Sequence, residues 1–453
     1  MPLTLAGLLA DAAKSDPERP ALAVDGRRLS YAELEARAAR AAGALAGRGV
    51  DAGDAVALVL PNRPESVAAF HGVLRLGAVV VPLNPLLSAR EVEQRVAHAG
   101  ARLVDVDELD GPPLEREARS SGDDVAVVLY TSGTTGDPKR VELTQAGLRL
   151  AAEYLAREGL GLRPDDVLFG AAPLAHVFGM SACMNAAIAA RACLALVPRF
   201  DPVVALATIE REGATVFMGV PSMCAALLAA SQETGRAPRM RIAHVGGAPL
   251  AVELLHAFEA RFELTVLEGW GMTECGGTAT TNHAGRPRKP GSVGTPASGG
   301  QVRIAEDGEV MLRGPTLARG LGDWFATGDV GRLDEDGYLY LIDRKKDVIL
   351  RGGYSVYPRE VEEALYAHPC VREAVVVGVP HDTLGEEVAA LVVPTGPDVD
   401  PETMKAFVRE RVAAYKYPRL VVLVDELPHG PSGKIQRREI DRTSLARRLE
   451  RGW

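Results

Sequence analysis

Strand-like apolar runs alternate with amphipathic helical segments through the N-terminal part of the chain, and this alternation limits the folds open to it. Ser30 with Glu33, and Ser88 with Glu91, each form a capping box ahead of a helical stretch. The predicted helices are residues 32–47, 64–76 and a segment that begins after Ser88, and the predicted strands are residues 55–60, 78–82 and 102–106. Because neighbouring parallel strands need a crossover helix, the pattern predicts a doubly wound, largely parallel α/β core.

The C-terminal part has a different order of elements and is expected to form its own unit. Residues 358–367 and 401–413 are predicted helices, and residues 371–379, 387–393 and 420–425 are predicted strands. This is the pattern of a compact α+β unit. The charged stretch 343–347 lies between two strand-like runs. We therefore expect a large N-terminal domain at residues 1–342 and a small, mobile α+β domain at residues 343–453.

Charge and cysteine usage exclude several classes of protein. The formal net charge is −9 and the basic residues are scattered, which argues against a nucleic-acid partner; the arginine-rich end, 437–451, is interpreted as a solvated helix. The five cysteines form no C-x-x-C pair, so neither a zinc site nor a disulfide framework is indicated, and a reducing cytoplasm is expected. The apolar window 177–190 is shorter than the roughly 20 residues of a membrane span and predicts a buried helix.

The strongest local signal is a polar, glycine-rich run directly after the apolar strand 125–129. It reads Tyr130-Thr131-Ser132-Gly133-Thr134-Thr135-Gly136-Asp137-Pro138-Lys139. Glycines let backbone N–H groups turn toward an anion, hydroxyls add donors and Lys139 adds charge, so the run predicts phosphate binding. A Walker A loop is excluded because Pro138 separates Lys139 from the glycines. The structural alternative is a polar hairpin turn.

Five further motifs follow along the chain. They are Gly246-Gly247-Ala248-Pro249, Gly269-Trp270-Gly271-Met272-Thr273-Glu274, Thr327-Gly328-Asp329, Asp343-Arg344-Lys345-Lys346-Asp347 and Pro431-Ser432-Gly433-Lys434. In this order, and over essentially the whole chain, they resemble the adenylate-forming superfamily of acyl-CoA synthetases, luciferases and peptide-synthetase adenylation domains. Within it the chain looks most like an acyl-CoA synthetase. The resemblance implies an acid–thiol ligase that uses ATP, Mg²⁺ and coenzyme A to form an acyl-adenylate and then a thioester.

By this resemblance, the nucleotide site is drawn from the phosphate loop and the later motifs. Its residues are Thr131, Ser132, Gly133, Thr134, Thr135, Gly136, Lys139, Gly246, Gly247, Ala248, Gly269, Trp270, Gly271, Asp329 and Arg344. Thr273 would donate to the α-phosphate, and Glu274 would hold Mg²⁺, which takes few protein oxygens beside substrate phosphates. Asp329 would accept from the ribose hydroxyls, and Trp270, where the family usually has tyrosine, would stack on adenine. The structural alternative for Thr273 is a helix cap, and Asp329 taken alone would be read as a simple Asx-turn, because Thr-Gly-Asp is a short motif.

The resemblance also implies catalytic, hinge and acyl-binding residues. Lys434 would bridge the substrate carboxylate and the α-phosphate, neutralising charge in the transition state. Lys346 would be the hinge, and Gly352 with Gly353 would line the tunnel for the pantetheine arm, a hairpin turn being the alternative. The acyl pocket would include His176, Phe178, Met180, Met218, Val220, Met272 and Cys275. The segments that carry these residues hold no Lys or Arg, so a neutral, apolar monocarboxylic acid is expected. His176 by itself is equally a core histidine.

Three features depart from the family pattern. Arg140 stands where glycine is usual, Gln145 stands where histidine is common, and the connections around residues 107–123 and 314–323 are short. Arg140 adds bulk and charge beside the phosphate loop. Two other functions stay open from the sequence. An adenylating enzyme that loads an acyl-carrier protein needs the same motifs, and a catalytically silent acyl- or nucleotide-binding protein would share the fold.

Overall fold

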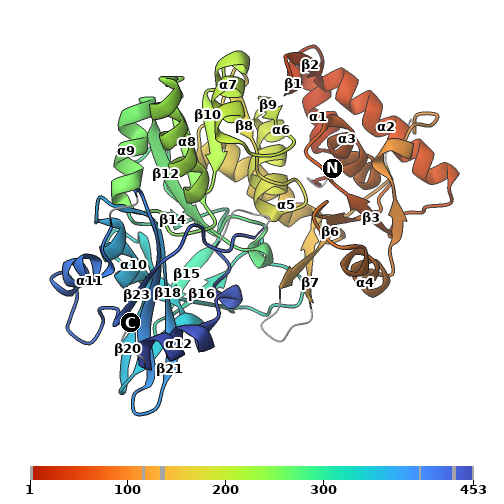
Figure 1. Ribbon diagram of the computed structural model, residues 1–453. Helices are drawn as coiled ribbons and strands as arrows, with labels where there is room; N and C mark the ends of the chain where they lie inside the picture. Colours follow the sequence, from red (N-terminus) through yellow and green to blue (C-terminus); the bar gives the residue numbers. More distant parts are fainter. Residues whose placement is uncertain (1–3, 115–117, 133–137, 397–398, 431–434, 451–453) are drawn as a thin grey trace.

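The computed structural model describes residues 4–114, 118–132, 138–396, 399–430 and 435–450. Figure 1 shows the C-terminal segment, in blue, as a lobe of its own beside the larger N-terminal part. Mixed sheets with helices on their faces and an antiparallel sheet make up the large part, and a mixed sheet with helices on both faces makes up the small one. The predicted fold class is therefore confirmed, whereas the predicted boundary at 342/343 falls within strand β18 (Leu339–Arg344), whose last residues still pair with β17 (Phe325–Leu333).

The first sheet follows the predicted alternation of strands and helices. Five described strands join in the order β5-β3-β4-β6-β7; their bounds are β3 Ala55–Val59, β4 Val79–Leu83, β5 Arg102–Val104, β6 Val125–Ser132 and β7 Pro138–Thr144. All are parallel except β7, which returns antiparallel to β6. The nearby helices are α1 Leu8–Ser15, α2 Tyr31–Gly47, α3 Pro64–Arg75 and α4 Ala89–Ala99, with a 3₁₀ turn at Val106–Glu108. Both predicted capping boxes are present, at the starts of α2 and α4.

The central sheet carries the motifs that begin at Gly246 and Gly269. Nine of the described strands join in the order β14-β13-β12-β11-β10-β8-β9-β1-β2. Their bounds are β1 Pro20–Val24, β2 Arg27–Ser30, β8 Val167–Gly170, β9 Cys193–Leu196, β10 Val216–Gly219, β11 Ile242–Gly246, β12 Thr265–Trp270, β13 Thr280–Thr281 and β14 Thr295–Pro296. Strands β12 to β1 of this order are parallel, whereas β2, β13 and β14 add antiparallel edges that periodicity alone did not predict.

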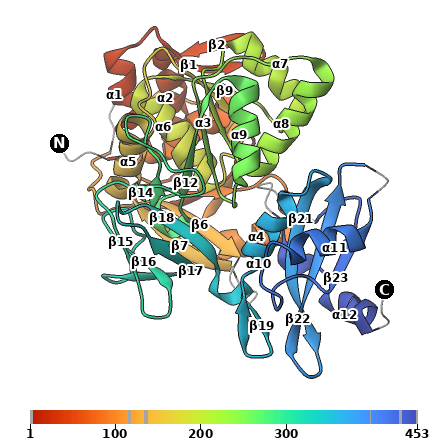
Figure 2. The same cartoon turned by 90° about the vertical axis from the view of Figure 1, so that its left-hand side faces the viewer.

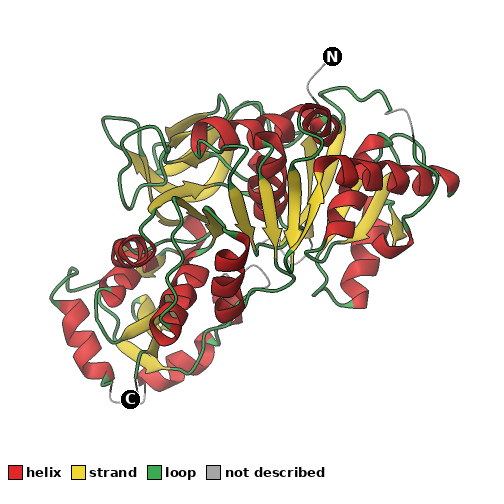
Figure 3. Ribbon diagram, turned by 90° about the horizontal axis from the view of Figure 1, so that it is seen from above, coloured by secondary structure: helices red, strands yellow, loops and turns green. Residues whose placement is uncertain are grey.

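Helices cover both faces of this sheet, which Figure 3 shows between two helical layers. One apolar core joins it to α7 Pro202–Glu212, α8 Pro221–Thr234 and α9 Val252–Phe262. The other core joins it to the first sheet and holds α5 Gln145–Tyr154, α6 Ala186–Ala190 and the π-helical turns Leu155–Gly159 and Phe178–Asn185. The predicted helix at 177–190 is thus a π-helical turn followed by α6, and both are largely buried, as expected. None of the helices in the described ranges is long and apolar enough to cross a membrane.

Two further sheets lie on either side of the charged stretch. An antiparallel sheet in the order β15-β16-β17-β18 precedes it, with bounds β15 Gln301–Ile304, β16 Glu309–Arg313, β17 Phe325–Leu333 and β18 Leu339–Arg344. The 3₁₀ turn Lys345–Asp347 leads into the small domain. Figure 2 shows that domain beside the β15–β18 sheet, with α10 between them.

The small domain packs helices on both faces of a mixed sheet. Its strands are β19 Ile349–Arg351, β20 Tyr354–Val356, β21 Val371–His381, β22 Gly385–Pro394 and β23 Leu420–Leu423. Helices α10 Pro358–Tyr366 and α11 Pro401–Arg409 cover one face, and α12 Arg442–Glu450 covers the other. A short 3₁₀ turn, Arg437–Glu439, precedes α12. Helix α11 ends before the predicted 413.

Proline marks where several of these helices begin. Five of the described helices have proline in the first turn, namely α3, α7, α8, α10 and α11. Proline suits this position because the first helical N–H has no intrahelical acceptor and the fixed φ already matches the helix. Asp201 and Asp400 also cap α7 and α11 by accepting backbone N–H groups. The starts of these helices are therefore set by local chemistry.

Candidate functional site

The predicted phosphate loop connects two antiparallel strands. In the β6–β7 pair, Thr131 lies opposite Lys139 and Ser132 opposite Pro138, so the hairpin alternative describes the flanks of the motif. The side chain of Ser132 and the predicted residues Gly133, Thr134, Thr135 and Gly136 lie outside the described residues. Lys139 is exposed, and its Nζ lies 5.9 Å from the centroid of the Phe325 ring. The base of the hairpin thus faces the start of β17.

Local partners account for both unusual residues near this hairpin. Arg140 pairs with Glu142 two residues along the same strand, with 2.8 Å between Nη2 and Oε1. The carbonyl of Glu142 accepts from the backbone N–H of Arg319 at 3.0 Å. Gln145 is buried, and its Oε1 accepts from the backbone N–H of Ala6 at 3.0 Å. The charge of Arg140 is therefore balanced by Glu142, and Gln145 holds the N-terminal segment through its hydrogen bond to Ala6.

Glu274 lies in a short 3₁₀ turn, Thr273–Cys275, which follows β12. The residue is only 8% exposed. Gly271 opens this segment, and a Cβ there would lie 2.2 Å from the carbonyl oxygen of Gly277. In the part of the chain that the structure describes, no group of three or more His, Cys, Asp and Glu side chains is placed to hold a metal ion. One buried carboxylate fits Mg²⁺ that takes its other ligands from substrate phosphates and water.

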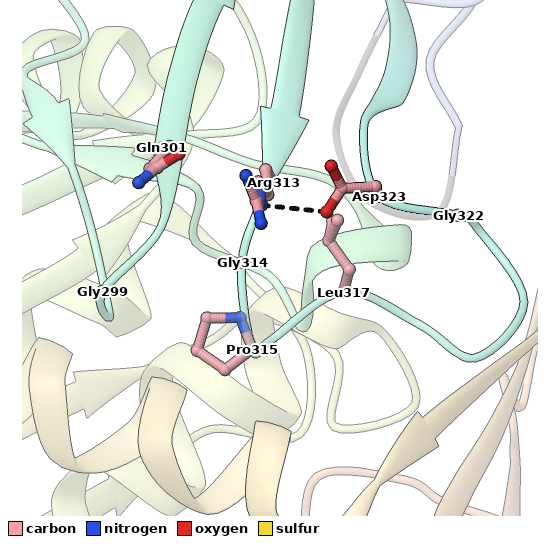
Figure 4. A pocket seen from close by; sticks show the side chains of 8 residues that line it. All are labelled: Gly299, Gln301, Arg313, Gly314, Pro315, Leu317, Gly322 and Asp323. Carbon is pink, nitrogen blue, oxygen red and sulfur yellow. Dashed lines mark ion pairs between the residues drawn. The ribbon is translucent and has the colours of Figure 1, made fainter.

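The short connection 314–323 ties two predicted motifs together. The Ala318 N–H donates to the carbonyl of Glu274 at 2.8 Å, and the next N–H, of Arg319, donates to β7. An open pocket lies at the start of this connection (Figure 4); its lining residues are Gly299, Gln301, Arg313, Gly314, Pro315, Leu317, Gly322 and Asp323. Arg313 and Asp323 face each other there, with 2.9 Å between Nε and Oδ1. None of the lining residues was predicted to bind substrate.

Small residues end the two strands that carry the adenine motifs. Gly246 and Gly269 lie side by side at the carboxyl ends of β11 and β12. A Cβ on Gly246 would lie 2.8 Å from the carbonyl oxygen of Gly269, so the strands can approach this closely only with glycine here. Gly247 and Ala248 follow as exposed residues. Ligands of parallel α/β sheets bind at this edge, which suits a flat base lying against the backbone.

The predicted ribose carboxylate is held by two side chains. Asp329, on β17, is buried and lies opposite Arg344 in the β17–β18 pair. Arg344 Nε is 2.9 Å from Asp329 Oδ1, and the indole Nε1–H of Trp270 donates to Oδ2 at 3.0 Å. The Asp329 N–H donates to the Thr327 hydroxyl at 3.1 Å. The structure therefore brings Trp270, Asp329 and Arg344 together, and the indole hydrogen bond is a role for Trp270 that the sequence did not predict.

The predicted acyl residues fall into more than one apolar cluster. Met180 and Met218 are fully buried in the core beneath β10 and β11, and Phe178 packs against that core. Val220 belongs to the core on the opposite face, and Met272 and Cys275 lie in a smaller cluster beside β16. Met180 and Met218 thus share a core with Phe178, whereas Val220 does not. His244, which belongs to none of the sequence motifs, lies on the same face of the sheet as Met218.

His176 helps to start the π-helical turn. Its Nδ1 accepts the backbone N–H of Phe178 at 3.2 Å, and its carbonyl accepts from Met180 at 2.9 Å. The ring is partly exposed. Such contacts give His176 a local structural role and are compatible with a position at the pocket edge.

Ion pairs surround the predicted hinge on both sides. Lys345 Nζ contacts Asp307 Oδ2 at 2.6 Å and Glu309 Oε2 at 2.9 Å, so this residue is fixed to the large domain. On the other side, Asp347 lies 3.7 Å from Arg437 of the small domain. Lys346 stands between them and is exposed. Lys346 therefore stands between a residue paired with the large domain and one paired with the small domain.

A second set of contacts holds the small domain against β18. The Arg359 N–H donates to Asp343 Oδ2 and its guanidinium donates to the carbonyl of Leu341, both at 2.8 Å. Burial raises the pKa of Asp343 to about 6, although the N–H groups of Arg359 and Arg344 oppose the shift. Arg359 and Asp343 are both largely buried. These contacts connect the start of α10 to the large domain.

The arginine-rich end is not wholly solvated, which corrects the expectation for Arg437. This side chain pairs with Glu362 as well as with Asp347, and it is one-quarter exposed, at 25%. Arg437 therefore fastens the start of the last segment to α10 and to the hinge turn, because an unpaired charge would be costly at such burial. Lys434, the predicted catalytic lysine, lies outside the described residues.

Gly352 and Gly353 form the tip of the β19–β20 hairpin, the alternative that the sequence left open. Their φ angles are +56° and +85°, in the region that glycine tolerates. The Gly352 N–H donates to the carbonyl of Leu384 at 2.8 Å. Next to the tip, the exposed ring of Tyr354 stacks on Tyr415 with 4.8 Å between centroids. An exposed hairpin of this kind is suited to line a path for a thiol arm.

Comparisons with known proteins identify the family. The model described as AMP-binding enzyme matches residues 9–112 and 105–321, and the model of the AMP-binding enzyme C-terminal domain matches residues 360–434. The chain belongs to the AMP-binding enzyme family. The resemblance drawn from the motifs is thereby confirmed.

Individual relatives align over nearly the full length of this AMP-binding enzyme. A long-chain-fatty-acid–CoA ligase of Bacillus subtilis is 31% identical, over 96% of this chain and 94% of the relative. The crystal structure of the anthranilate CoA ligase AuaEII in complex with anthranoyl-AMP has a TM-score of 0.89 at 27% identity, covering 99% of this chain and 98% of that one. The O-succinylbenzoate coenzyme A synthetase from Bacillus subtilis, in complex with ATP and magnesium ion, has a TM-score of 0.82 at 32% identity, covering 96% and 98%.

Glu268 is a buried acid just before the adenine motif of this AMP-binding enzyme. Burial raises its pKa from 4.5 to about 7, although the Gly291 N–H, Arg359 and Arg288 oppose the shift. The Gly291 N–H donates to Oε2 at 2.8 Å. Between pH 4.5 and 7 the folded protein thus keeps a proton that the unfolded chain has released. Stability contributed by this group is present at low pH and is lost as the pH rises through that window.

We expect Glu268→Gln to reduce the loss of stability with rising pH. The amide still accepts from Gly291 but carries no charge, so at pH 8 the variant should be more stable than the wild type by up to about 3 kcal/mol. At pH 5 the difference should be less than about 1 kcal/mol. Urea unfolding at both pH values measures it. A difference that is equal at the two pH values would show that Glu268 does not titrate in this range.

Proposed function

We propose that this AMP-binding enzyme is an ATP-dependent carboxylic acid–CoA ligase that acts in two steps. The observation that carries the proposal is the cluster of Trp270, Asp329 and Arg344, which holds a buried carboxylate close to the carboxyl end of β12. The phosphate hairpin and the Glu274 turn are connected to each other through the 314–323 segment. Ribose, phosphate and metal functions are therefore proposed to meet near the carboxyl end of β12, where elements of the first sheet and of the β15–β18 sheet approach the central sheet.

The first step joins the acid to AMP. The substrate carboxylate attacks the α-phosphorus of ATP and pyrophosphate leaves, which gives an acyl-adenylate. Asp329 orients the ribose, Thr273 donates to the α-phosphate and Lys434 neutralises charge between the reacting groups. Magnesium, when bound near Glu274, neutralises charge on the leaving pyrophosphate. In the second step the thiol of coenzyme A attacks the acyl carbonyl and AMP leaves.

The two steps require two arrangements of the domains, and we place the division at 342/343 with the pivot at Lys346. The ion pairs of Lys345 with Asp307 and Glu309 support the pivot, because they hold the residue before it to the large domain. Rotation about a few boundary residues is a common way to exchange the faces that two domains present. One arrangement would present Lys434 and the other Gly352 and Gly353.

The acid is proposed to be neutral and largely apolar beyond its carboxylate. Met180 and Met218 are fully buried, and Phe178 adds an aromatic ring to the same core. A second carboxylate placed among these side chains would lack a partner, at a cost of several kcal/mol. Dicarboxylic acids such as malonate are therefore expected to be poor substrates.

The acyl acceptor and the cellular location of the enzyme are also proposed. Coenzyme A is the proposed acceptor, because it is named for the relatives that align over the whole chain. We place the enzyme in the cytoplasm, an assignment supported by free cysteines, four of which are buried.

ATP–pyrophosphate exchange across a panel of acids tests this function. The panel includes aliphatic and aromatic monocarboxylic acids and malonate, and thioester formation is measured in parallel with coenzyme A and with a carrier protein. Exchange that depends on a monocarboxylic acid, followed by CoA-ester formation, is the expected result. Absence of exchange with every acid would favour a silent binding protein. Exchange followed by loading of the carrier protein, without formation of a CoA ester, would identify the carrier protein as the acceptor.

Replacing Glu274 should weaken the use of metal in the first step. Glu274→Gln keeps the size of this 8% exposed residue but removes the charge, so we expect adenylation to fall about tenfold at limiting Mg²⁺ and to recover partly at high Mg²⁺. Pyrophosphate release as a function of Mg²⁺ concentration measures this. Glu259→Gln, on α9, provides a matched control. Equal Mg²⁺ dependence in wild type and Glu274→Gln would remove Glu274 from metal binding.

A further inference from the structure

His244 lies where the predicted acyl and nucleotide residues meet. It is on β11, two residues before Gly246, and it pairs in register with Met218 of β10. Residues two apart on a strand share a face, so His244 and Gly246 point to the same side as Met218. A Cβ on Gly269 would lie 2.5 Å from the His244 Cε1, which places the ring against this glycine, the residue before the end of β12.

The surroundings of the ring are apolar and aromatic. His244 is only 2% exposed, and its ring lies nearly parallel to that of Phe178, with an interplanar angle of 14° and 6.0 Å between centroids. Phe178 also lies 3.9 Å from where a Cβ on Gly246 would be. His244 therefore lies beside an aromatic residue of the proposed acyl site and beside Gly269 of the proposed adenine site.

One nitrogen of this ring lacks a partner. Within the described residues, Nδ1 of His244 is buried and makes no hydrogen bond. Burial lowers the pKa of the imidazole to about 4, with the backbone of Leu267 opposing the shift, so the ring is neutral at physiological pH. Leaving a buried polar atom unpaired costs about 1–3 kcal/mol. A ligand that supplies the missing hydrogen bond would recover that cost on binding.

We propose that His244 recognises a neutral hydroxyl or amino substituent on the acid, so that the substrate is a hydroxy- or amino-substituted carboxylic acid. The inference rests on the proposed ligase function and refines its substrate class. A neutral imidazole can complete a hydrogen bond, but it cannot balance a second carboxylate or an ammonium group. A hydroxyl can donate or accept, so it fits either tautomer of the ring. Phe178, parallel to the imidazole, suits an acid whose substituent is carried on a flat, apolar frame.

Matched pairs of acids test this assignment in the full-length wild type. The pairs are benzoate with its hydroxy and amino isomers, cinnamate with its hydroxy isomers, and octanoate with hydroxyoctanoates. We expect kcat/KM for pyrophosphate release to be at least about tenfold higher for one substituted acid than for its unsubstituted partner. Preference for the unsubstituted acid in every pair would overturn the inference while leaving the ligase function standing. No release with any acid would instead reject the proposed function.

Variants identify the group responsible. His244→Phe keeps an aromatic ring but removes the hydrogen bond, so it should reduce the ratio of substituted to unsubstituted kcat/KM by about tenfold or more. His244→Gln should restore part of the ratio. His71→Phe is the matched control, because His71 is equally buried and unpaired within the described residues but lies on α3. An unchanged ratio in His244→Phe would overturn the inference, and if that variant fails to fold, the wild-type ratios and His244→Gln decide it.

Discussion

Replacing Lys434 by alanine should lower acyl-adenylate formation by about 100-fold or more, the scale seen when one preorganised charge-stabilising group is removed. The lysine is proposed to neutralise the substrate carboxylate and the α-phosphate together, where negative charge builds up. Pyrophosphate release with ATP and the best acid measures this step. Conversion of a supplied acyl-adenylate and coenzyme A to the thioester should proceed at close to the wild-type rate, because the lysine is not needed once AMP is the leaving group.

A matched control separates this effect from a general loss of structure. Lys405→Ala removes a lysine from the same domain, one that pairs with Glu402 on α11 at 2.6 Å. It should leave both half-reactions near the wild-type rate, and circular dichroism confirms the folding of both variants. Equal loss of both half-reactions in Lys434→Ala would mean that this lysine does not serve adenylation alone, and the two-arrangement mechanism would have to be abandoned.

Local chemistry explains which parts of the fold were predictable. The capping boxes at Ser30 and Ser88 and the prolines that begin α10 and α11 act within one helical turn, so the sequence contains the whole signal. The antiparallel edges β13 and β14 are different, because two residues each are too few to show a strand period. Their pairing depends on neighbours distant in the chain.

The same distinction applies to the candidate site. Motifs identified Asp329 and Arg344 as single residues, but their ion pair depends on the register of β17 and β18. The partners of Arg437 are Glu362 and Asp347, which are far from it in sequence, and this explains why its arginine-rich surroundings suggested a solvated helix. His244 gave no signal, because one histidine in an apolar strand fits the core as well as a site. Only its neighbours across the sheet reveal the unpaired nitrogen.

Substituting proline for Lys346 should separate the two half-reactions in the opposite sense. Lys346 is the middle residue of the 3₁₀ turn Lys345–Asp347, and φ in such turns is close to the value that proline imposes. The proline variant should therefore keep the arrangement of the two domains seen in the structure and should resist rotation of the small domain away from it. If this arrangement serves the first step, adenylation should stay within about threefold of the wild type, while thioester formation falls on the order of 100-fold, the scale of a small misplacement of reacting groups.

The ion pairs around the hinge explain why this position should be so sensitive. Lys345 is fixed to Asp307 and Glu309 of the large domain, and Asp347 is close to Arg437 of the small one. A rotation that keeps both sets of contacts has to be taken up by the backbone between them. Lys346→Ala removes the charge but leaves φ free, so both half-reactions should remain near the wild type. Unchanged thioester formation in Lys346→Pro would place the pivot elsewhere, and equal losses in the alanine and proline variants would assign the effect to the lost charge.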